Sequence, residues 1–360
     1  MAIADSTTPP SVSPAATPAA PADWIRRIDP ALAVVAVILL LMPLLANEFI
    51  LFQIFSWSFI LGMIGLSLMF LAGYGGMVSL AQMTIAGFAG YMVAIFGVNG
   101  VGAISLGWPW WLAAPMALAL ATLFGTITGA LAVRTAGIYT IMITLAIAAA
   151  FFYFANQNYA LFNGHSGISS IATPKFWGVD WRAPVPFYYV TLGIAAICYG
   201  ATSYVARSPF GLALQGVRDN PRRMAALGFN VNAHRVAAYV FASVVAAIAG
   251  ILLVWSNEQI APGTVSVDNA IDILVIAVVG GISRPIGPFI GALIYVVLRT
   301  FALDFLVAIG LDGNRFRLLV GLGFLVIVFW SPDGVIGLWM RWRNRGLGSQ
   351  NVAGGGGGHG

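Results

Sequence analysis

The feature that most constrains this chain is a series of long apolar runs, several of them close to the roughly 20 residues that cross a hydrocarbon core as a helix. Hydrophobic residues make up 60% of the chain and charged residues 8%, whereas an ordinary soluble domain carries about 25% charged residues. The runs are continuous, whereas strands of a membrane barrel alternate apolar and polar residues. The sequence therefore predicts an all-α polytopic membrane protein.

The runs predict about ten transmembrane helices, because each approaches the length that a bilayer requires. They cover residues 31–46, 49–72, 77–97, 110–133, 137–157, 187–206, 235–256, 268–282, 286–303 and 316–331. The glycines and prolines of GGISRPIGPFIGA at 280–292 interrupt regular helix geometry. We therefore expect a broken or re-entrant segment there.

Basic residues are single and lie mostly at the ends of the apolar runs, which indicates topology and not a nucleic-acid partner. Their distribution predicts a multi-pass membrane protein with both termini in the cytoplasm. The expected parts are a disordered N-terminal tail at 1–28, a transmembrane domain at 29–340, and a basic, then Gly-rich, C-terminal tail at 341–360.

The internal loop at 207–234 carries its own helix punctuation. Ser208 before Pro209 and Asn220 before Pro221 each place a capping side chain ahead of a proline at the first helical position. Gly228 supplies a stop. This pattern predicts two short helices, at about 209–217 and 221–227, that dock on the membrane surface, on the protein's own spans or on a partner.

The chain lacks a site for chemistry of its own. A phosphate-binding loop needs glycines followed by Gly-Lys-Ser/Thr, and the single lysine, Lys175, lies between Pro174 and Phe176. Histidines occur only at 165, 234 and 359, without carboxylates or metal-ligand spacing beside them. We therefore expect no enzyme activity and no cofactor on this chain, so energy for active transport must come from elsewhere.

Polar side chains inside the apolar runs are candidates for a substrate path, since burying them without partners costs free energy. The candidates are Ser79, Gln82, Thr84, Tyr139, Thr140, Thr144 and Asp272. Thr140 and Thr144 share one helix face. Serine and threonine in membrane helices often bond to backbone instead. Asp272 is either a functional intramembrane carboxylate or hydrated at a span end.

Several motifs in order resemble the LivH/LivM family of ABC importer permeases, over about 60–340. They are GMVSLAQMTIAGFAGY at 76–91, LAVRTAGIYTIMITLA at 131–146, VVGGISRPIGPFIGA at 278–292 and PDGVIGL at 332–338. Residues 208–228 resemble the family's cytoplasmic coupling loop: Arg218, Asp219 and Asn220 match its Arg-Asp-Asn, and Ala225, Ala226, Leu227 and Gly228 its Ala-rich helix end. The acidic residue usual before the alanines is absent, because Met224 stands there.

The resemblance implies a LivM-type permease that imports branched-chain or similar amino acids. It implies a second permease of LivH type, two LivG/LivF-type ATPases that hold ATP and magnesium, and a periplasmic amino-acid-binding protein. Residues 218–220 and 224–228 would then couple to the ATPase. Related permeases carry urea or short amides, and the residues do not exclude these. A self-sufficient secondary transporter and a membrane anchor are the other readings that the sequence leaves open.

Overall fold

The computed structural model describes residues 30–308 except 103, 136, 177 and 178. It divides into two compact units, Met1–Ala46 and Asn47–Gly360. In the first unit the described part is a helix, α1 (Pro30–Leu45). Both expected tails, the tenth apolar run and the motif at 332–338 lie outside the described residues.

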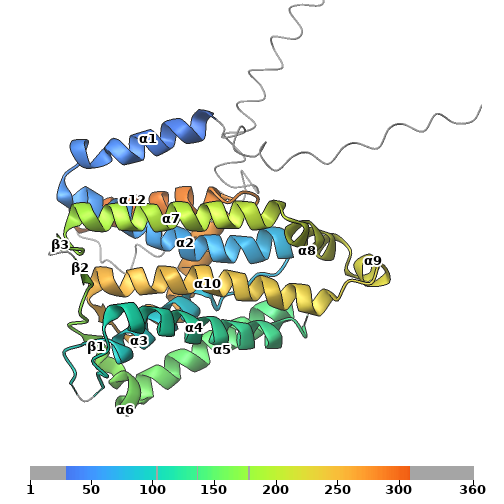
Figure 1. Cartoon of the computed structure of the whole chain (residues 1–360), viewed down its shortest axis with the longest axis horizontal. Helices are drawn as coiled ribbons and strands as arrows, with labels where there is room; N and C mark the ends of the chain where they lie inside the picture. Colours follow the sequence, from blue (N-terminus) through green and yellow to red (C-terminus); the bar gives the residue numbers. More distant parts are fainter. Residues whose placement is uncertain (1–29, 103, 136, 177–178, 309–360) are drawn as a thin grey trace, which may run out of the picture. The chain divides into compact units, whose positions relative to one another are not determined.

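The described part of the second unit is a bundle of helices with a few two-residue strands (Figure 1). Its first helix is continuous over residues 50–74 and consists of η2 (Ile50–Ser56), α2 (Trp57–Met69) and η3 (Phe70–Tyr74). The other long elements are α3 (Gln82–Phe96), α4 (Trp110–Ala132), α5 (Ile138–Gln157), α7 (Pro184–Arg207), α10 (Val231–Asn257), α11 (Val267–Gly280) and α12 (Gly287–Ala308). Shorter elements are α6 (Tyr159–Phe162), η4 (Gly164–Ser166), α8 (Pro209–Asp219), α9 (Pro221–Ala226) and η5 (Pro262–Val265).

Each apolar run that falls within the described residues contains a helix, which confirms the all-α membrane fold. Among the described residues, five helices are long and apolar enough to cross a bilayer: 50–74, α4, α5, α7 and α10. The helical structure is interrupted between Gly280, where α11 ends, and Gly287, where α12 begins. The break expected in the Gly/Pro-rich segment is therefore present, with Gly281 at a φ of 110°.

Two ends of the bundle differ in structure and charge. The strand end holds β1 (Ile168–Ser169), paired antiparallel with β4 (Gln259–Ile260), and β2 (Lys175–Phe176), paired with β3 (Val179–Asp180). The opposite end, which we call the arginine end, holds α8 and α9. Most basic residues of the described chain lie at the arginine end, namely Arg134, Arg207, Arg218, Arg222, Arg223, Arg235 and Arg284.

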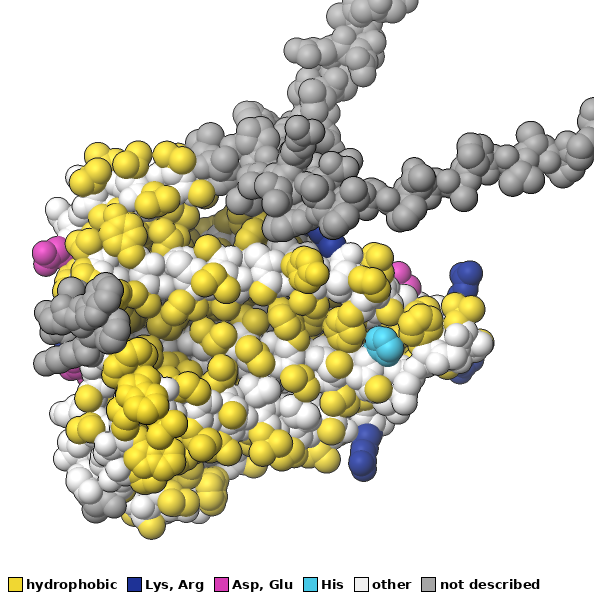
Figure 2. All heavy atoms as spheres, viewed as in Figure 1, with side chains coloured by type: hydrophobic (Ala, Val, Ile, Leu, Met, Phe, Trp, Pro, Cys, Tyr) yellow, Lys and Arg dark blue, Asp and Glu magenta, His cyan; other side chains and the backbone are white. Residues whose placement is uncertain are grey.

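Burial separates central from peripheral helices. The most apolar stretch of helix 50–74 is 89% buried and that of α10 is 67% buried, whereas α4, α5 and α7 are buried over about a third of theirs. Figure 2 shows hydrophobic side chains over the length of the visible face, with dark blue ones at the arginine end. Helix 50–74 and α10 therefore form the interior, and α4, α5 and α7 present apolar faces suited to lipid.

Helix α3 is too short to cross a membrane. Its 15 residues extend about 22 Å, against a hydrocarbon core of about 30 Å. The sequence predicted a span from residue 77, but residues 76–81 are not helical. Met77 and Ala81 are nevertheless buried, so this segment runs inside the bundle from the arginine end, and α3 starts within it.

Helix α11 repeats this arrangement in the opposite direction. It has 14 residues and follows the segment 258–266, which leaves the strand end and contains η5. Val265 in η5 is fully buried against the middle of α3, because a Cβ added to Gly87 would lie 1.9 Å from its side chain. Each of the two short helices thus follows a segment that is not α-helical: 76–81, which is largely buried, before α3, and 258–266, which contains η5, before α11.

The central helices approach one another closely at glycines. A Cβ added to Gly250 of α10 would lie 1.9 Å from the backbone oxygen of Ala86 in α3. Such backbone contact between membrane helices requires small residues at the crossing. The position of α3 against α10 therefore depends on Gly250 having no side chain.

Candidate functional site

The loop at the arginine end folds as its punctuation predicts. The Ser208 hydroxyl accepts a hydrogen bond from the Gly211 amide at the start of α8, and the Asn220 side chain accepts one from the Arg223 amide at the start of α9. Gly228 follows α9 with a φ of 89°, which is the left-handed conformation that ends a helix. The expected caps and stop are confirmed.

Helix α8 docks on the protein's own bundle. Leu214 and Val217 are fully buried. Leu214 belongs to a cluster with Phe70 and Leu71 of helix 50–74 and with Tyr239 of α10. The sequence left three docking surfaces open: the membrane surface, the protein's own spans and a partner. The apolar face of α8 docks on the protein's own spans.

Helix α9 projects from the bundle instead. Met224 packs back on Gly216 of α8, but Ala225, Ala226 and Gly228 are exposed, and the Leu227 side chain is 65% exposed. Arg222 and Arg223 are exposed on the same short helix. The loop is thus half docked and half free, and its free half offers two alanines and a leucine next to two arginines.

Arg218 connects the loop to the central helix. Its guanidinium donates a hydrogen bond to the backbone oxygen of Gly73 and another, of 2.8 Å, to Asp219. The last carbonyls of a helix have no amide partners within it, and a cation there also offsets the helix dipole. Arg218 therefore caps the C-terminal end of helix 50–74 from a distance of 145 residues along the chain.

Three segments meet at this cap, which we call the Gly73 junction. A Cβ added to Gly73 would lie 2.3 Å from the backbone oxygen of Ile282, in the turn between α11 and α12. A Cβ added to Gly76 would lie 2.6 Å from the Arg218 side chain. The loop thus contacts the end of helix 50–74 and the start of the segment 76–81, and the end of helix 50–74 in turn contacts the Gly-rich turn. A movement of α8 would reach the segments attached to both short helices.

Polar side chains gather where α3 begins, and we call this group the polar seam. The Ser67 hydroxyl donates to Gln82 Oε1 at 3.0 Å, and Gln82 Nε2 donates to the Ser79 hydroxyl at 3.5 Å. The Leu80 amide donates to the Thr144 hydroxyl at 3.2 Å. All four polar side chains are buried, so the seam joins helix 50–74, α3 and α5 inside the bundle.

The structure brings some sequence-predicted residues to the seam and leaves others apart. Ser79, Gln82 and Thr144 are in it, and Thr84, two residues after Gln82 on α3, is fully buried with no hydrogen-bond partner in the described residues. Thr140 is buried but bonds Thr135 at its own helix end, while Tyr139 is 65% exposed on the other face of α5.

Asp272 lies outside the seam. It is partly buried on α11, and its carboxylate accepts a hydrogen bond of 2.8 Å from the Tyr295 hydroxyl on α12. It thereby joins the two helices on either side of the Gly-rich turn.

Sequence reasoning missed two members of these sites. Ser67 is one of three serines in the apolar run 49–72, and nothing in its neighbours marks it as the partner of Gln82. Gly73 gave no signal as the acceptor for Arg218, because backbone acceptors carry no sequence signature. The uncapped start of α3, where Ala81 offers no side-chain acceptor, was the one readable hint that the helix begins unusually.

The chain is similar in sequence to known permeases. The chain is 24% identical to the branched-chain amino acid transport permease LivM of Methanocaldococcus jannaschii, over 76% of this chain and 80% of that protein. It is 22% identical to the high-affinity branched-chain amino acid permease LivM of Escherichia coli, over 76% and 65% of the two chains. It is 24% identical to the ribose import permease RbsC of Haemophilus influenzae, over 69% and 76%.

No solved structure matches the chain. A family model does: the model described as the permease component of the branched-chain amino acid transport system matches residues 50–329, which contain both the Gly73 junction and the polar seam. The chain therefore belongs to the family of branched-chain amino acid transport system permease components.

Proposed function

We propose that this chain is the transmembrane permease subunit of an ATP-driven importer for branched-chain or similar amino acids in the bacterial inner membrane. The observation that carries the proposal is the half-docked loop of a membrane permease: α8 is buried in the bundle while α9 is exposed. A segment built to transmit movement needs one part fixed to each of two bodies, and α8 already supplies one attachment.

In this proposal α9, with residues 218–220 and 224–228, contacts one of two LivG/LivF-type ATPases, which hold ATP and magnesium. A LivH-type permease covers part of the exposed apolar surface, and a periplasmic binding protein delivers the amino acid at the strand end. The arginine end faces the cytoplasm, which agrees with the enrichment of basic residues on that side of membrane proteins. Urea or a short amide remains the alternative cargo, and a secondary transporter the alternative machine.

Whether uptake depends on ATP distinguishes an ATP-driven importer from a secondary transporter. We expect proteoliposomes that contain the full-length chain, its partner subunits and lumenal ATP to accumulate L-leucine from its binding protein, and to continue when a protonophore is added. Urea and ribose serve as comparison cargoes. The full-length chain alone should accumulate none. Accumulation by the chain alone, abolished by the protonophore, would establish the secondary-transporter reading in its place.

The polar seam is proposed as part of the route. A Gln82→Leu substitution leaves the Ser67 hydroxyl bonded to the Ile64 backbone oxygen at 2.6 Å, so the free energy of unfolding should change by about 1 kcal/mol or less. Leucine uptake should nevertheless fall about tenfold, since a polar contact on the route contributes on that scale.

The matched control for the seam is Ser58→Ala. Ser58 is also buried in helix 50–74, but its hydroxyl bonds only to the Ile54 backbone oxygen of the same helix. Its uptake should equal that of the unmodified importer. Normal uptake by Gln82→Leu would remove Gln82 from the route.

A further inference from the structure

A cavity opens at the strand end, away from the seam and the Gly73 junction. Its volume is about 620 Å³, within the range of about 300–1,000 Å³ that is usual for small-molecule sites. It is lined by side chains of α3, α4 and α10 and of the loops between them, including Val98, Trp108, Trp110, Ile171, Trp255 and Glu258. The cavity is thus mostly apolar and aromatic, with one carboxylate.

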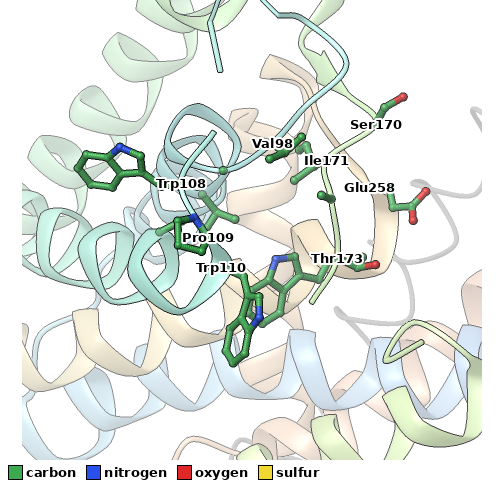
Figure 3. A pocket seen from close by; sticks show the side chains of 13 residues that line it. Val98, Trp108, Pro109, Trp110, Ser170, Ile171, Thr173 and Glu258 are labelled. Atoms are coloured by element: carbon green, nitrogen blue, oxygen red, sulfur yellow. The ribbon is translucent and has the colours of Figure 1, made fainter. Parts of the chain in front are cut away.

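Polar groups occupy one side of the cavity. Figure 3 shows Ser170, Glu258 and Thr173 spread along one side of the view, with their oxygens directed away from Val98, Ile171 and Trp110. The Glu258 carboxylate is 3.3 Å from the Arg182 guanidinium, and both side chains are about 40% exposed. Arg182 itself lines an adjoining hollow, together with Trp110, Thr173 and Trp255. The Glu258 carboxylate at the edge of the cavity therefore has a positive group beside it, and one small molecule could contact both.

The backbone at this edge is strained. Three residues other than glycine have a positive φ in the described chain, and two of them, Ser170 at 54° and Glu258 at 52°, line this cavity. The Ile171 amide donates a hydrogen bond of 3.0 Å to the Glu258 backbone oxygen, and β1 pairs with β4 beside them. Such conformations persist only where surrounding structure enforces them, and they concentrate at ligand sites.

We propose that this cavity is the first docking site for the free amino acid, and that it recognises the zwitterion. The ammonium lies between the Glu258 carboxylate and the indole faces, which attract cations. The carboxylate takes the Arg182 guanidinium, and an aliphatic side chain packs on Val98 and Ile171. This assignment rests on the proposed import function and specifies the cargo by its two charges.

Exchange of partners makes this binding favourable. An exposed ion pair contributes little free energy by itself, so opening the Arg182–Glu258 pair costs little. Each of its charges then gains an opposite charge on the ligand, beside indoles that exclude water. An uncharged amide such as urea would have to break the pair without replacing it, so the cavity discriminates against that alternative cargo.

Site-specific labelling can test this directly in the full-length chain in lipid nanodiscs. Cys198 is the only cysteine and is buried, so a Cys198→Ser background makes a Thr173→Cys variant the single labelling site at the cavity edge. We expect L-leucine to slow maleimide labelling at this position. The probes 4-methylpentanoate, without the ammonium, and 3-methylbutylamine, without the carboxylate, should protect only at concentrations about tenfold higher or more.

Glu258→Gln in this background should raise the leucine concentration needed for protection at least about tenfold and abolish the advantage of leucine over 4-methylpentanoate. Glu258→Asp should keep that advantage, since it keeps the charge. The matched control is Glu48→Gln, an exposed glutamate that does not line the cavity, and it should protect like the parent. The labelling rate without ligand should be equal in all variants if the loop stays folded.

Two outcomes would overturn the proposal: no protection by leucine in the parent, or equal protection by leucine and 4-methylpentanoate. If either result were found while ATP-dependent leucine uptake stayed intact, the cavity would not be the docking site, and the import function would still hold. Loss of the import function would instead show in the uptake assay, with labelling unaffected by that result.

Discussion

In a Gly250→Leu variant, most of the protein is expected to be unfolded. The first side-chain carbon would lie 1.9 Å from the backbone oxygen of Ala86, and a backbone atom cannot be moved aside as a flexible side chain can. Forcing atoms into a packed interior costs about 1–3 kcal/mol and more when backbone must shift. We expect a loss of about 3 kcal/mol or more, which is a large share of a typical folding free energy.

Thermal stability in detergent, followed by size-exclusion chromatography after heating, measures this loss. The control is the same substitution at Gly200 in the peripheral helix α7, where an added Cβ has no atom within 4 Å. Gly200→Leu should be at least as stable as the parent, since glycine is about 0.8–1 kcal/mol worse than the best helix formers. Equal melting of the two variants would show that the α3–α10 crossing is not close.

An Arg218→Ala variant is expected to weaken the connection between the loop and helix 50–74, and so to reduce transport. The substitution removes the hydrogen bonds to Gly73 and Asp219 but leaves the buried contacts of Leu214 and Val217, so α8 should stay docked. We expect ATP-dependent leucine uptake to fall about tenfold or more, because the loop would no longer hold the end of helix 50–74. Rates of uptake and of ATP hydrolysis should be measured on the same proteoliposomes.

Arg222→Ala provides the comparison. Arg222 lies on α9 and is exposed, so this variant removes the same charge from the same loop without touching the Gly73 junction. Its uptake should stay well above that of Arg218→Ala. Equal losses in the two variants would mean that net charge toward the partner, and not the bond to Gly73, is what matters.

The sequence could predict what local rules decide. Apolar length located the helices, and the Ser208, Asn220 and Gly228 signals located α8 and α9, because caps act on residues two or three positions away. It could not predict that 76–81 is non-helical. MVSLA is as apolar as the helix that follows it, and only the distant Thr144 hydroxyl supplies a partner for the Leu80 amide.

The candidate site was predicted in the same uneven way. Thr140 and Thr144 share a face of α5 and are both buried, as their spacing indicates, but only the packing of α3 decides that Thr144 alone reaches the seam. The role of Arg218 as a cap also depends on a pairing with a residue 145 positions away in the sequence. Distant backbone partners of this kind leave no pattern in the local sequence.

The buried non-helical segment before α3 limits how this protein can change shape. Four of its amides donate hydrogen bonds, Gly76 to Ala72, Met77 to Leu71, Leu80 to the Thr144 hydroxyl and Ala81 to the Ser79 hydroxyl, and a hydrocarbon surrounding offers no substitute acceptor. If α3 slid along α5, the Leu80 amide would be stranded unless a water molecule arrived at that instant. Helices α3 and α5 must therefore shift as a rigid pair, or the passage must become wet before either can move.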